Sequence, residues 1–342
     1  MQRTSVIFNK PYEIKLVQSP VPAPGAEEVL VKTRVSAISP GTELLVYRGQ
    51  FPPDLPVDAA IPDLVRPFEY PLAYGYASVG QVFEVGRKAN AELLGRPVFC
   101  FHPHESHYTI PQDQVILLPD DIEMRDAAFL ATMETAVNFL MDGRPVIGEN
   151  IVVFGLGIVG LLTVALLARL PLGSLTALDP CALRREAAMA AGADFVLDSD
   201  AADILEDVSR RLKSAAGANG ADLVYELSGN PSALNQALAI AGPGARIVIG
   251  SWYGNKKAAL DLGGSFHRNR IRLISSQVST LAARFSSRWT KNRRLNVSLE
   301  MIRQLNPGRF VTHRFSVQQA AQAYRLLDKR PQEAVQVLLT YE

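Results

Sequence analysis

A glycine pattern that follows a short apolar run constrains the fold of this chain more than any other feature. Residues 151–154 read Ile-Val-Val-Phe, and Gly155, Gly157 and Gly160 come directly after them. An apolar stretch follows, and then the run Ser-Leu-Thr-Ala-Leu, which leads into Asp179. This order predicts a buried strand, a tight turn, a helix and a second strand, as in a doubly wound α/β sheet.

Such a unit is suited to binding a dinucleotide. The glycines let the backbone approach a pyrophosphate, and Gly157, Ile158 and Val159 offer backbone groups to it at the helix N-terminus. Asp179 lies about 20 residues beyond the turn, where a carboxylate binds ribose hydroxyls and repels a 2′-phosphate. We therefore predict NAD(H) as the cofactor. Arg184–Arg185 keep NADP(H) open as the alternative, because an arginine here accepts a 2′-phosphate; otherwise these residues form a solvated helical turn.

The bulk composition excludes several classes of protein. A length of 342 residues predicts two domains, and 48% hydrophobic residues can build sizeable cores. A net charge of +1 gives no overall attraction to nucleic acid or to an anionic membrane. The two cysteines, Cys100 and Cys181, exclude a disulfide framework and a four-cysteine zinc lobe. The apolar stretch after residue 150 is long enough to span a membrane, but its glycines favour a strand and a helix. The N-terminus reads as a first strand, and we predict a cytoplasmic protein.

The secondary-structure pattern changes near residue 121. Residues 1–120 are β-rich, with alternating runs at 28–35 and 78–85. The proline-rich segment 49–71 is predicted to be an ordered loop, either a lid over a site or a surface excursion. Residues 122–278 alternate strand and helix, as a parallel sheet requires. The expected strands are 151–154, 175–179, 194–197, 222–226, 246–250 and 271–275, with a helix at 183–191; helices near 297–305 and 317–328 and a strand at 334–340 follow.

Five stretches of the sequence, residues 35–43, 71–80, 152–160, 221–230 and 310–324, carry a resemblance to a known family. Together they resemble the medium-chain dehydrogenase/reductase superfamily, the relatives of zinc alcohol dehydrogenase, over essentially the whole chain. The resemblance implies a β-rich GroES-like catalytic domain at 1–121, completed by 307–342, and a Rossmann NAD(P)-binding domain with a six-stranded doubly wound sheet at 122–306. It also implies a homodimer that pairs through the sixth strand. The start Ser-Pro-Gly-Thr-Glu looks most like the branch of bacteriochlorophyllide hydroxyethyl dehydrogenases.

The resemblance breaks at the positions that hold the catalytic zinc in zinc-dependent members. Pro40 stands where the family has a cysteine, and Tyr76 stands where it has a histidine. The third ligand precedes the nicotinamide-contacting threonine by four residues, so it falls at Ala131, before Thr135. Because proline, tyrosine and alanine are not the usual zinc ligands, we expect no catalytic zinc.

Side chains near the lost zinc site are the candidates for catalysis. By resemblance, Thr42 has the hydroxyl that relays the substrate proton. The phenol of Tyr76 either hydrogen-bonds a developing oxyanion or only fills the space left by zinc. Glu43 is expected to orient its neighbours rather than to transfer a proton.

Three of the five histidines, His102, His104 and His107, lie within six residues. If the preceding strand continued, His102 and His104 would share a face and His107 would complete a replacement metal site. Pro103 interrupts that strand, so His104 is retained as a candidate for substrate binding or acid catalysis, with a structural role for the cluster as the alternative.

Two further sets of residues complete the predicted site. By resemblance, the cofactor groove is lined after the later strands by Ser228, Gly229, Gly250, Ser251, Trp252, Ser276, Gln277 and Val278. The second set is a basic run around Trp289, which either docks an acidic substrate group or is a solvated helix face. It comprises Arg284, Arg288, Lys291, Arg293 and Arg294.

The sequence thus predicts a zinc-independent, NAD(H)-dependent oxidoreductase that transfers a hydride between nicotinamide and an alcohol or carbonyl substrate. Its partners are expected to be a small-molecule substrate and a second copy of the chain. One alternative is an enone or quinone reductase, in which the hydride goes to an activated alkene. An alternative from another class is a non-catalytic nucleotide-binding sensor.

Overall fold

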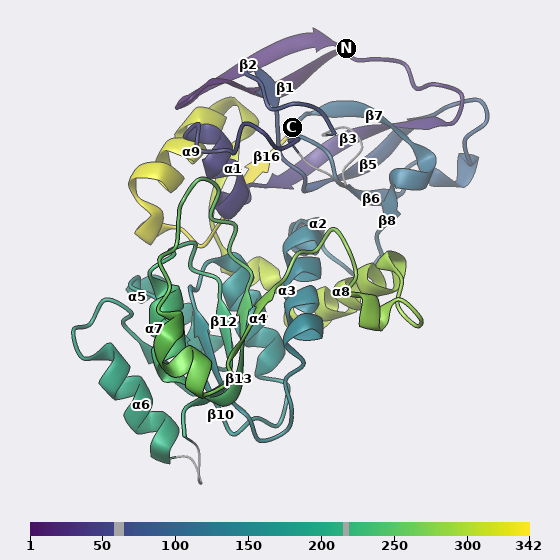
Figure 1. Cartoon of the computed structure of the whole chain (residues 1–342). Helices are drawn as coiled ribbons and strands as arrows, with labels where there is room; N and C mark the ends of the chain where they lie inside the picture. The colour runs from purple at the N-terminus through teal and green to yellow at the C-terminus, as the bar shows by residue number, and fades with distance from the viewer. Residues whose placement is uncertain (58–64, 215–218) are drawn as a thin grey trace. The chain divides into compact units, whose positions relative to one another are not determined.

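The computed structural model, which describes residues 1–57, 65–214 and 219–342, divides the chain into two compact units (Figure 1). Unit 1 comprises residues 1–131 and 302–342, and unit 2 comprises residues 132–301. The proline-rich segment predicted as a loop falls partly outside the described residues, which omit 58–64. Among the described residues, no helix combines the length and the apolar character that crossing a membrane requires.

Unit 1 is built on strands that pair antiparallel, except for the parallel pair β15–β16. A three-stranded sheet has the order β2-β1-β4, from β1 (Gln2–Lys10), β2 (Glu13–Pro20) and β4 (Leu72–Ala73). A seven-stranded sheet has the order β15-β16-β3-β5-β6-β8, with β7 also paired to β3. Its strands are β3 (Glu28–Ala37), β5 (Ser78–Val85), β6 (Pro97–Cys100), β7 (His107–Pro111), β8 (Ile116–Leu117), β15 (Val311–Ser316) and β16 (Gln336–Thr340).

The C-terminal segment completes the larger sheet of unit 1, because β16 pairs antiparallel with β3 (Figure 1). Helices α1 (Pro40–Tyr47) and α9 (Ala320–Lys329) pack with β1 and β16 around one apolar core. Burial of Phe8, Val46, Tyr324 and Val337 in this core anchors the start of α1. The helix predicted near 317–328 begins at Ala320, because Val317–Gln319 form a 3-10 turn before it.

Unit 2 is a doubly wound parallel sheet of six strands in the order β11-β10-β9-β12-β13-β14. The prediction of a Rossmann fold is thereby confirmed. All residues of β9 and β10 and most residues of β12 are buried, as parallel strands covered on both faces require. The bounds are β9 (Asn150–Phe154), β10 (Ser174–Leu178), β11 (Phe195–Leu197), β12 (Ala221–Glu226), β13 (Ala241–Ile249) and β14 (Arg272–Ser275).

The helices of unit 2 connect these strands in the order that the sequence predicts. They are α3 (Leu130–Gly143), α4 (Ile158–Leu167), α5 (Ala182–Ala190), α6 (Ile204–Ser214), α7 (Ala233–Ile240) and α8 (Lys291–Leu305), and unit 1 also contains α2 (Met124–Ala127). The predicted strands agree within about two residues, except that β13 begins at Ala241 rather than at residue 246. Helix α8 is longer than predicted and includes part of the arginine-rich segment.

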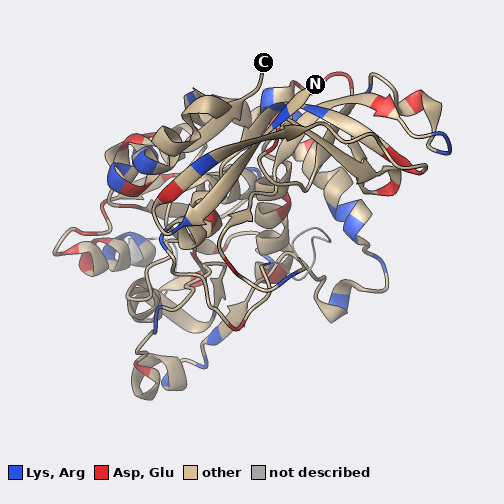
Figure 2. Cartoon of the chain, turned by 90° about the horizontal axis from the view of Figure 1, so that it is seen from above, with Lys and Arg blue, Asp and Glu red and all other residues tan. Residues whose placement is uncertain are grey.

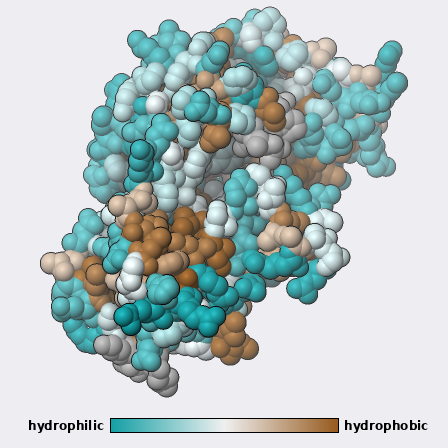
Figure 3. Space-filling model, in the orientation of Figure 1, coloured by the Kyte–Doolittle hydropathy of each residue, from teal (hydrophilic) through white to brown (hydrophobic). Residues whose placement is uncertain are grey.

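The surface agrees with the balanced composition. Acidic and basic residues are interspersed over both units (Figure 2), in line with a net charge of +1. The face drawn in Figure 3 is mostly hydrophilic, and its most extensive apolar area lies over unit 2.

Candidate functional site

Three hydroxyl groups of unit 1 meet at the start of α1. Pro40 begins the helix, a position that its fixed φ suits. Ser39, just before it, does not cap the helix with its side chain. Instead, Ser39 Oγ accepts a hydrogen bond of 2.5 Å from Tyr76 Oη, and Thr42 Oγ1 lies 3.3 Å from the same phenol. The structure therefore brings the predicted pair Thr42 and Tyr76 together and adds Ser39, whose place directly before Pro40 is the only signal in the sequence.

The residues at the expected zinc positions do not fit a zinc ion. Pro40 and Ala131 have no donor atom in their side chains, and the phenol of Tyr76 is hydrogen-bonded to Ser39. Within residues 1–57, 65–214 and 219–342, no group of three or more histidine, cysteine or acidic side chains could hold a metal ion. The donor set that tetrahedral zinc requires is therefore not assembled from these positions.

Glu43 and His104 form a fully buried pair behind the three hydroxyls, with both side chains 0% exposed. His104 Nε2 lies 3.0 Å from Glu43 Oε2, and His104 Nδ1 lies 2.7 Å from Ser36 Oγ. Glu43 Oε1 accepts the backbone N–H of Ser39 at 2.7 Å. Tyr324 Oη donates to Glu43 Oε2. Both ring nitrogens of His104 are engaged in the interior, so the prediction that this histidine contacts substrate is wrong for this arrangement.

Two further groups define the surroundings of this pair. Burial, and then the nearby charge of Glu43, raise the pKa of Tyr324 well above its ordinary value, so that phenol remains a donor. Gly75, which has φ +120°, lies against the His104 ring, because a Cβ there would come within 2.6 Å of Cδ2. The glycine before Tyr76 is thus required both by its backbone conformation and by the histidine ring.

We expect Glu43→Gln to lower the free energy of unfolding by about 3 kcal/mol. An amide would direct N–H donors at a site where Ser39 N, His104 and Tyr324 supply hydrogen-bond donors to the two carboxylate oxygens. Urea unfolding measures the loss. Glu13→Gln is the matched control, since Glu13 lies near the surface, where it pairs with Lys10 and Lys15 and accepts a hydrogen bond from Asn9 Nδ2. Equal unfolding free energies for the two variants would contradict the assignment.

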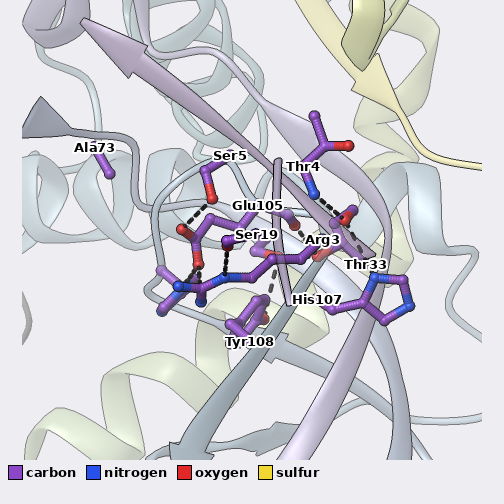
Figure 4. A network of polar contacts seen from close by, with 12 residues as sticks. Arg3, Thr4, Ser5, Ser19, Thr33, Ala73, Glu105, His107 and Tyr108 are labelled. Atoms are coloured by element: carbon purple, nitrogen blue, oxygen red, sulfur yellow. Dashed lines mark hydrogen bonds and ion pairs between the residues drawn. The ribbon is translucent and has the colours of Figure 1, made fainter. Parts of the chain in front are cut away.

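The other two histidines of the cluster, His102 and His107, have separate structural partners; Figure 4 shows the contacts around Glu105 and the position of His107. Strand β6 ends at Cys100, so the strand that would align His102 with His104 does not continue. His102 Nε2 lies 3.1 Å from Glu105 Oε2, and its ring stacks on Tyr108. Glu105 also binds Arg3 at 3.3 Å and Ser5 Oγ at 2.6 Å, while His107 Nδ1 lies 3.1 Å from Ser106 Oγ. The replacement metal site is therefore wrong, because each ring serves a different hydrogen-bond network.

In unit 2, the glycines form an open turn at the carboxyl end of β9. Gly155 has φ +88°, and a Cβ there would lie 2.4 Å from Ser228 Cα. A Cβ on Gly160 would lie 2.0 Å from Gly155 O. Gly157, the N-cap of α4, differs, because a Cβ there would meet no described atom within 4 Å. Two glycines thus allow close backbone packing, and the third leaves the first N–H groups of α4 open toward a phosphate.

Asp179 follows β10 and lies beside this turn. Its Oδ2 accepts the N–H of Leu156 at 2.8 Å, and its Oδ1 accepts the N–H of Cys181 at 2.9 Å. Arg184 Nη1 lies 3.8 Å from the same carboxylate. Arg185 donates to Asp179 O and pairs with Asp198. The arginine side chains are 23% and 22% exposed, so both are partly buried against acidic partners and partly open to solvent.

Residues beyond β12 and β13 form a second polar cluster. Fully buried Glu226 accepts the N–H of Ser228 at 2.8 Å and the hydroxyl of Tyr253. Gly229 N donates to Ser251 Oγ at 2.8 Å. Burial, and then the bond to Glu226, raise the pKa of Tyr253. Sequence reasoning missed Glu226 and Tyr253, although Glu226 ends a strand at the carboxyl edge, where α/β proteins bind ligands.

The other predicted groove residues are Gly250, Trp252, Thr135, Ser276 and Gln277. A Cβ on Gly250 would lie 2.3 Å from the Phe139 ring, and Trp252 is 39% exposed. Thr135 lies half-buried on α3, whereas Ser276 and Gln277 follow β14.

The arginines of the basic run have different surroundings in the structure. Arg284 binds Asp142 at 3.2 Å, and the guanidinium of Arg293 lies 4.4 Å from the centre of the Trp289 ring. Arg294 is fully buried and pairs with Glu134. Both interpretations of the run, anion docking and a solvated face, are therefore wrong for Arg294.

Comparisons with known proteins find dehydrogenases that are similar to this chain. The family model of zinc-binding dehydrogenases matches residues 159–294. The starvation-sensing protein RspB of Escherichia coli K12 is 22% identical, with 98% of this chain and 99% of that protein covered. D-Guloside 3-dehydrogenase of the same strain is 23% identical, with 92% and 93% covered. The solved structure of the E. coli CFT073 alcohol dehydrogenase rspB, complexed with NADH, has a TM-score of 0.80 at 19% identity and covers 99% of each chain.

Proposed function

Because this chain belongs to the medium-chain dehydrogenase/reductase superfamily, we propose that it transfers a hydride between NAD(H) and an alcohol or carbonyl substrate without a catalytic zinc ion. The observation that carries the proposal is the cluster of Tyr76, Ser39 and Thr42 hydroxyls in unit 1. A phenol occupies the position where, by resemblance, relatives have a metal ligand, and it is held by two further proton-bearing groups. Hydroxyl donors can stabilise a developing oxyanion without a metal.

The residues of unit 2 fit a nicotinamide dinucleotide. The open face at Gly157 and the backbone of Ile158 and Val159 would hold the pyrophosphate, and Asp179 would bind the adenosine ribose. The carboxylate is fixed by two backbone N–H groups, which supports NAD(H) over NADP(H). We also propose that the predicted groove residues contact the cofactor. These are Thr135, Gly155, Arg184, Ser228, Gly229, Gly250, Ser251, Trp252, Ser276 and Gln277. When bound, the cofactor supplies or accepts the hydride at nicotinamide C4.

The proposed proton path uses the unit 1 hydroxyls. Hydroxyl hydrogens rotate, so Ser39 Oγ, Tyr76 Oη and Thr42 Oγ1 can pass a proton toward a substrate oxygen. Glu43 holds the backbone of Ser39, and His104 holds Glu43. We therefore assign Glu43 and His104 as positioning residues for the start of α1 rather than as groups that touch substrate.

The remaining predictions belong to the same proposal. They are the substrate domain at 1–121 with 307–342, the cofactor domain at 122–306, the homodimer and the cytoplasmic location. Three relatives are named D-guloside 3-dehydrogenase, L-threonine 3-dehydrogenase and sorbitol dehydrogenase, after hydroxylated compounds, which supports an alcohol and its carbonyl product as the substrate class.

The proposal predicts that chelator-treated protein oxidises NADH with a ketone and prefers NADH to NADPH. The experiment follows absorbance at fixed protein concentration with ketones, aldehydes, enones and quinones, before and after dialysis against a chelator. Activity that disappears on dialysis and returns with Zn²⁺ would contradict the zinc-free mechanism. Turnover of enones or quinones alone would select the reductase alternative. NADH binding with no turnover of any compound would select the sensor.

A further inference from the structure

Arg294 of α8 is the largest fully buried side chain among the described residues. Each of its five N–H donors has an acceptor in reach. Nε and Nη2 lie 3.0 and 2.9 Å from Glu134 Oε1, and Nη1 lies 2.6 Å from Asn138 Oδ1. The remaining contacts are to backbone carbonyls, from Nη2 to Val278 O and from Nη1 to Thr280 O at 3.5 Å. One guanidinium therefore joins α3, α8 and the segment after β14.

The acceptors on α3 belong to one helical face, because Glu134, Asn138 and Asp142 are spaced by four residues. The same face of α3 also binds residues other than Arg294. Asn138 Nδ2 donates to Ser276 Oγ at 3.0 Å, and Ser276 Oγ donates to Asp142 Oδ2 at 2.7 Å. Arg284 binds the other oxygen of Asp142. The segment 276–284 is thus held to α3 at both ends, and Figure 1 shows α3 and α8 side by side.

Stability alone does not account for this arrangement. A buried ion pair must offset the desolvation of two charges, and apolar side chains of similar volume often serve equally well. A guanidinium adds five directed donors in a rigid plane, which fixes the backbone carbonyls that it binds. Residues 276–280 contain no helix or strand, so the two carbonyl contacts define the path of that segment.

The location of the segment connects it to the cofactor. Ser276 directly follows the carboxyl end of β14, the edge where doubly wound sheets bind their ligands. Glu134 is the neighbour in sequence of Thr135, which faces the nicotinamide in our proposal. Arg294 therefore joins two side chains of α3 to the backbone of a segment that lines one end of the proposed groove.

We propose that Arg294 is a positioning residue that fixes the segment 276–280 against α3 and so shapes the nicotinamide end of the cofactor groove. This inference rests on the proposed binding of NAD(H). It assigns to the buried part of the basic run a role that its sequence does not indicate.

Arg294→Met and Arg246→Met provide a matched test on the full-length chain. Arg246 is also nearly buried and binds Glu149, but Glu149 precedes β9 at the opposite, amino end of the sheet. We expect both variants to melt at lower temperature. Only Arg294→Met should weaken NADH binding, by about tenfold or more as a displaced binding group does, and should speed hydrogen exchange of amides 276–284 in the protein without NADH. Fluorescence titration with NADH and mass spectrometry measure the two effects.

Two further variants keep the test decisive if Arg294→Met folds poorly. The double variant Glu134→Gln with Arg294→Met leaves no unpaired buried charge and should recover stability but not NADH affinity. Arg294→Lys keeps the charge with only three donors, and the segment should still exchange faster.

Wild-type affinity and slow exchange in Arg294→Met, or full recovery with lysine, would overturn the inference. Failure of the wild-type chain to bind NADH would instead overturn the proposed function, and the exchange measurement would still test the attachment of the segment.

Discussion

We expect Gly157→Asp to weaken NADH binding at least about 100-fold while the protein stays folded. Gly157 has φ −61° and ψ 179°, which any residue can adopt, and a Cβ there meets no described atom within 4 Å. An aspartate at this N-cap can accept the free N–H groups of α4, so the helix should gain stability. The same carboxylate would occupy the proposed pyrophosphate site, where a like charge at about 4 Å costs several kcal/mol. Fluorescence titration with NADH and a thermal melt record the two effects.

Two variants serve as controls for this prediction. Gly157→Ala adds only a methyl group and should retain most of the affinity. Gly160→Ala should instead destabilise unit 2, because its Cβ would lie 2.0 Å from Gly155 O. If Gly157→Asp bound NADH as the wild-type chain does, the pyrophosphate would not lie at the start of α4.

We expect Tyr76→Phe to lower kcat for ketone reduction by about 100-fold or more, as the loss of one oxyanion donor does. The phenol contacts both Ser39 Oγ and Thr42 Oγ1, at 2.5 and 3.3 Å. Loss of its hydroxyl removes a donor and breaks the proposed proton path, while NADH affinity should not change because the cofactor residues lie in unit 2. The stability loss should be about 1 kcal/mol, the cost of one hydrogen bond. Steady-state kinetics with NADH and a responsive ketone provide the measurement.

Tyr70→Phe is the matched control for Tyr76→Phe. Tyr70 Oη donates to Val46 O, and burial raises the pKa of this phenol to about 12, so it has a structural partner of its own. Its loss should leave kcat unchanged. Ser39→Ala should give a smaller decrease than Tyr76→Phe, since Thr42 remains within reach of the phenol. Unchanged kcat in Tyr76→Phe, with Ser39→Ala equally active, would show that these hydroxyls do not carry the proton.

The strand, glycine turn and helix of the proposed cofactor half were predictable because they are local in sequence. A run of buried β-branched residues, three glycines at fixed spacing and an acidic residue after the next strand lie between positions 150 and 179. A Cβ added at one of these glycines would meet backbone atoms of the same turn or of the residues after β12, or would meet open space. The sequence also shows that Pro40 and Ala131, at two of the positions where the family's zinc ligands are expected, have side chains that cannot bind a metal wherever they lie.

The contacts of the catalytic half were not predictable, because they depend on distant segments. Glu43 and Tyr324 are 281 positions apart, and Ser36 and Tyr341 are 305 apart. Ser36 and Tyr341 meet because β16 pairs with β3, and Glu43 and Tyr324 meet because α1 and α9 pack in one core. His104 had the composition of a catalytic group, but the fold buries it with both nitrogens bonded.

The sequence by itself determined the alternation of strand and helix, the glycine turn and the loss of the zinc ligands, whereas the tertiary structure decided which polar groups pair. The physical reason is that periodicity and backbone constraints act over a few residues, so they are present in the local sequence. The partner of a buried polar group depends instead on which remote backbones the core brings together. Arg294 illustrates this. In the sequence it is one residue of a basic run, and its five N–H donors find acceptors only when α3 and the segment after β14 surround it.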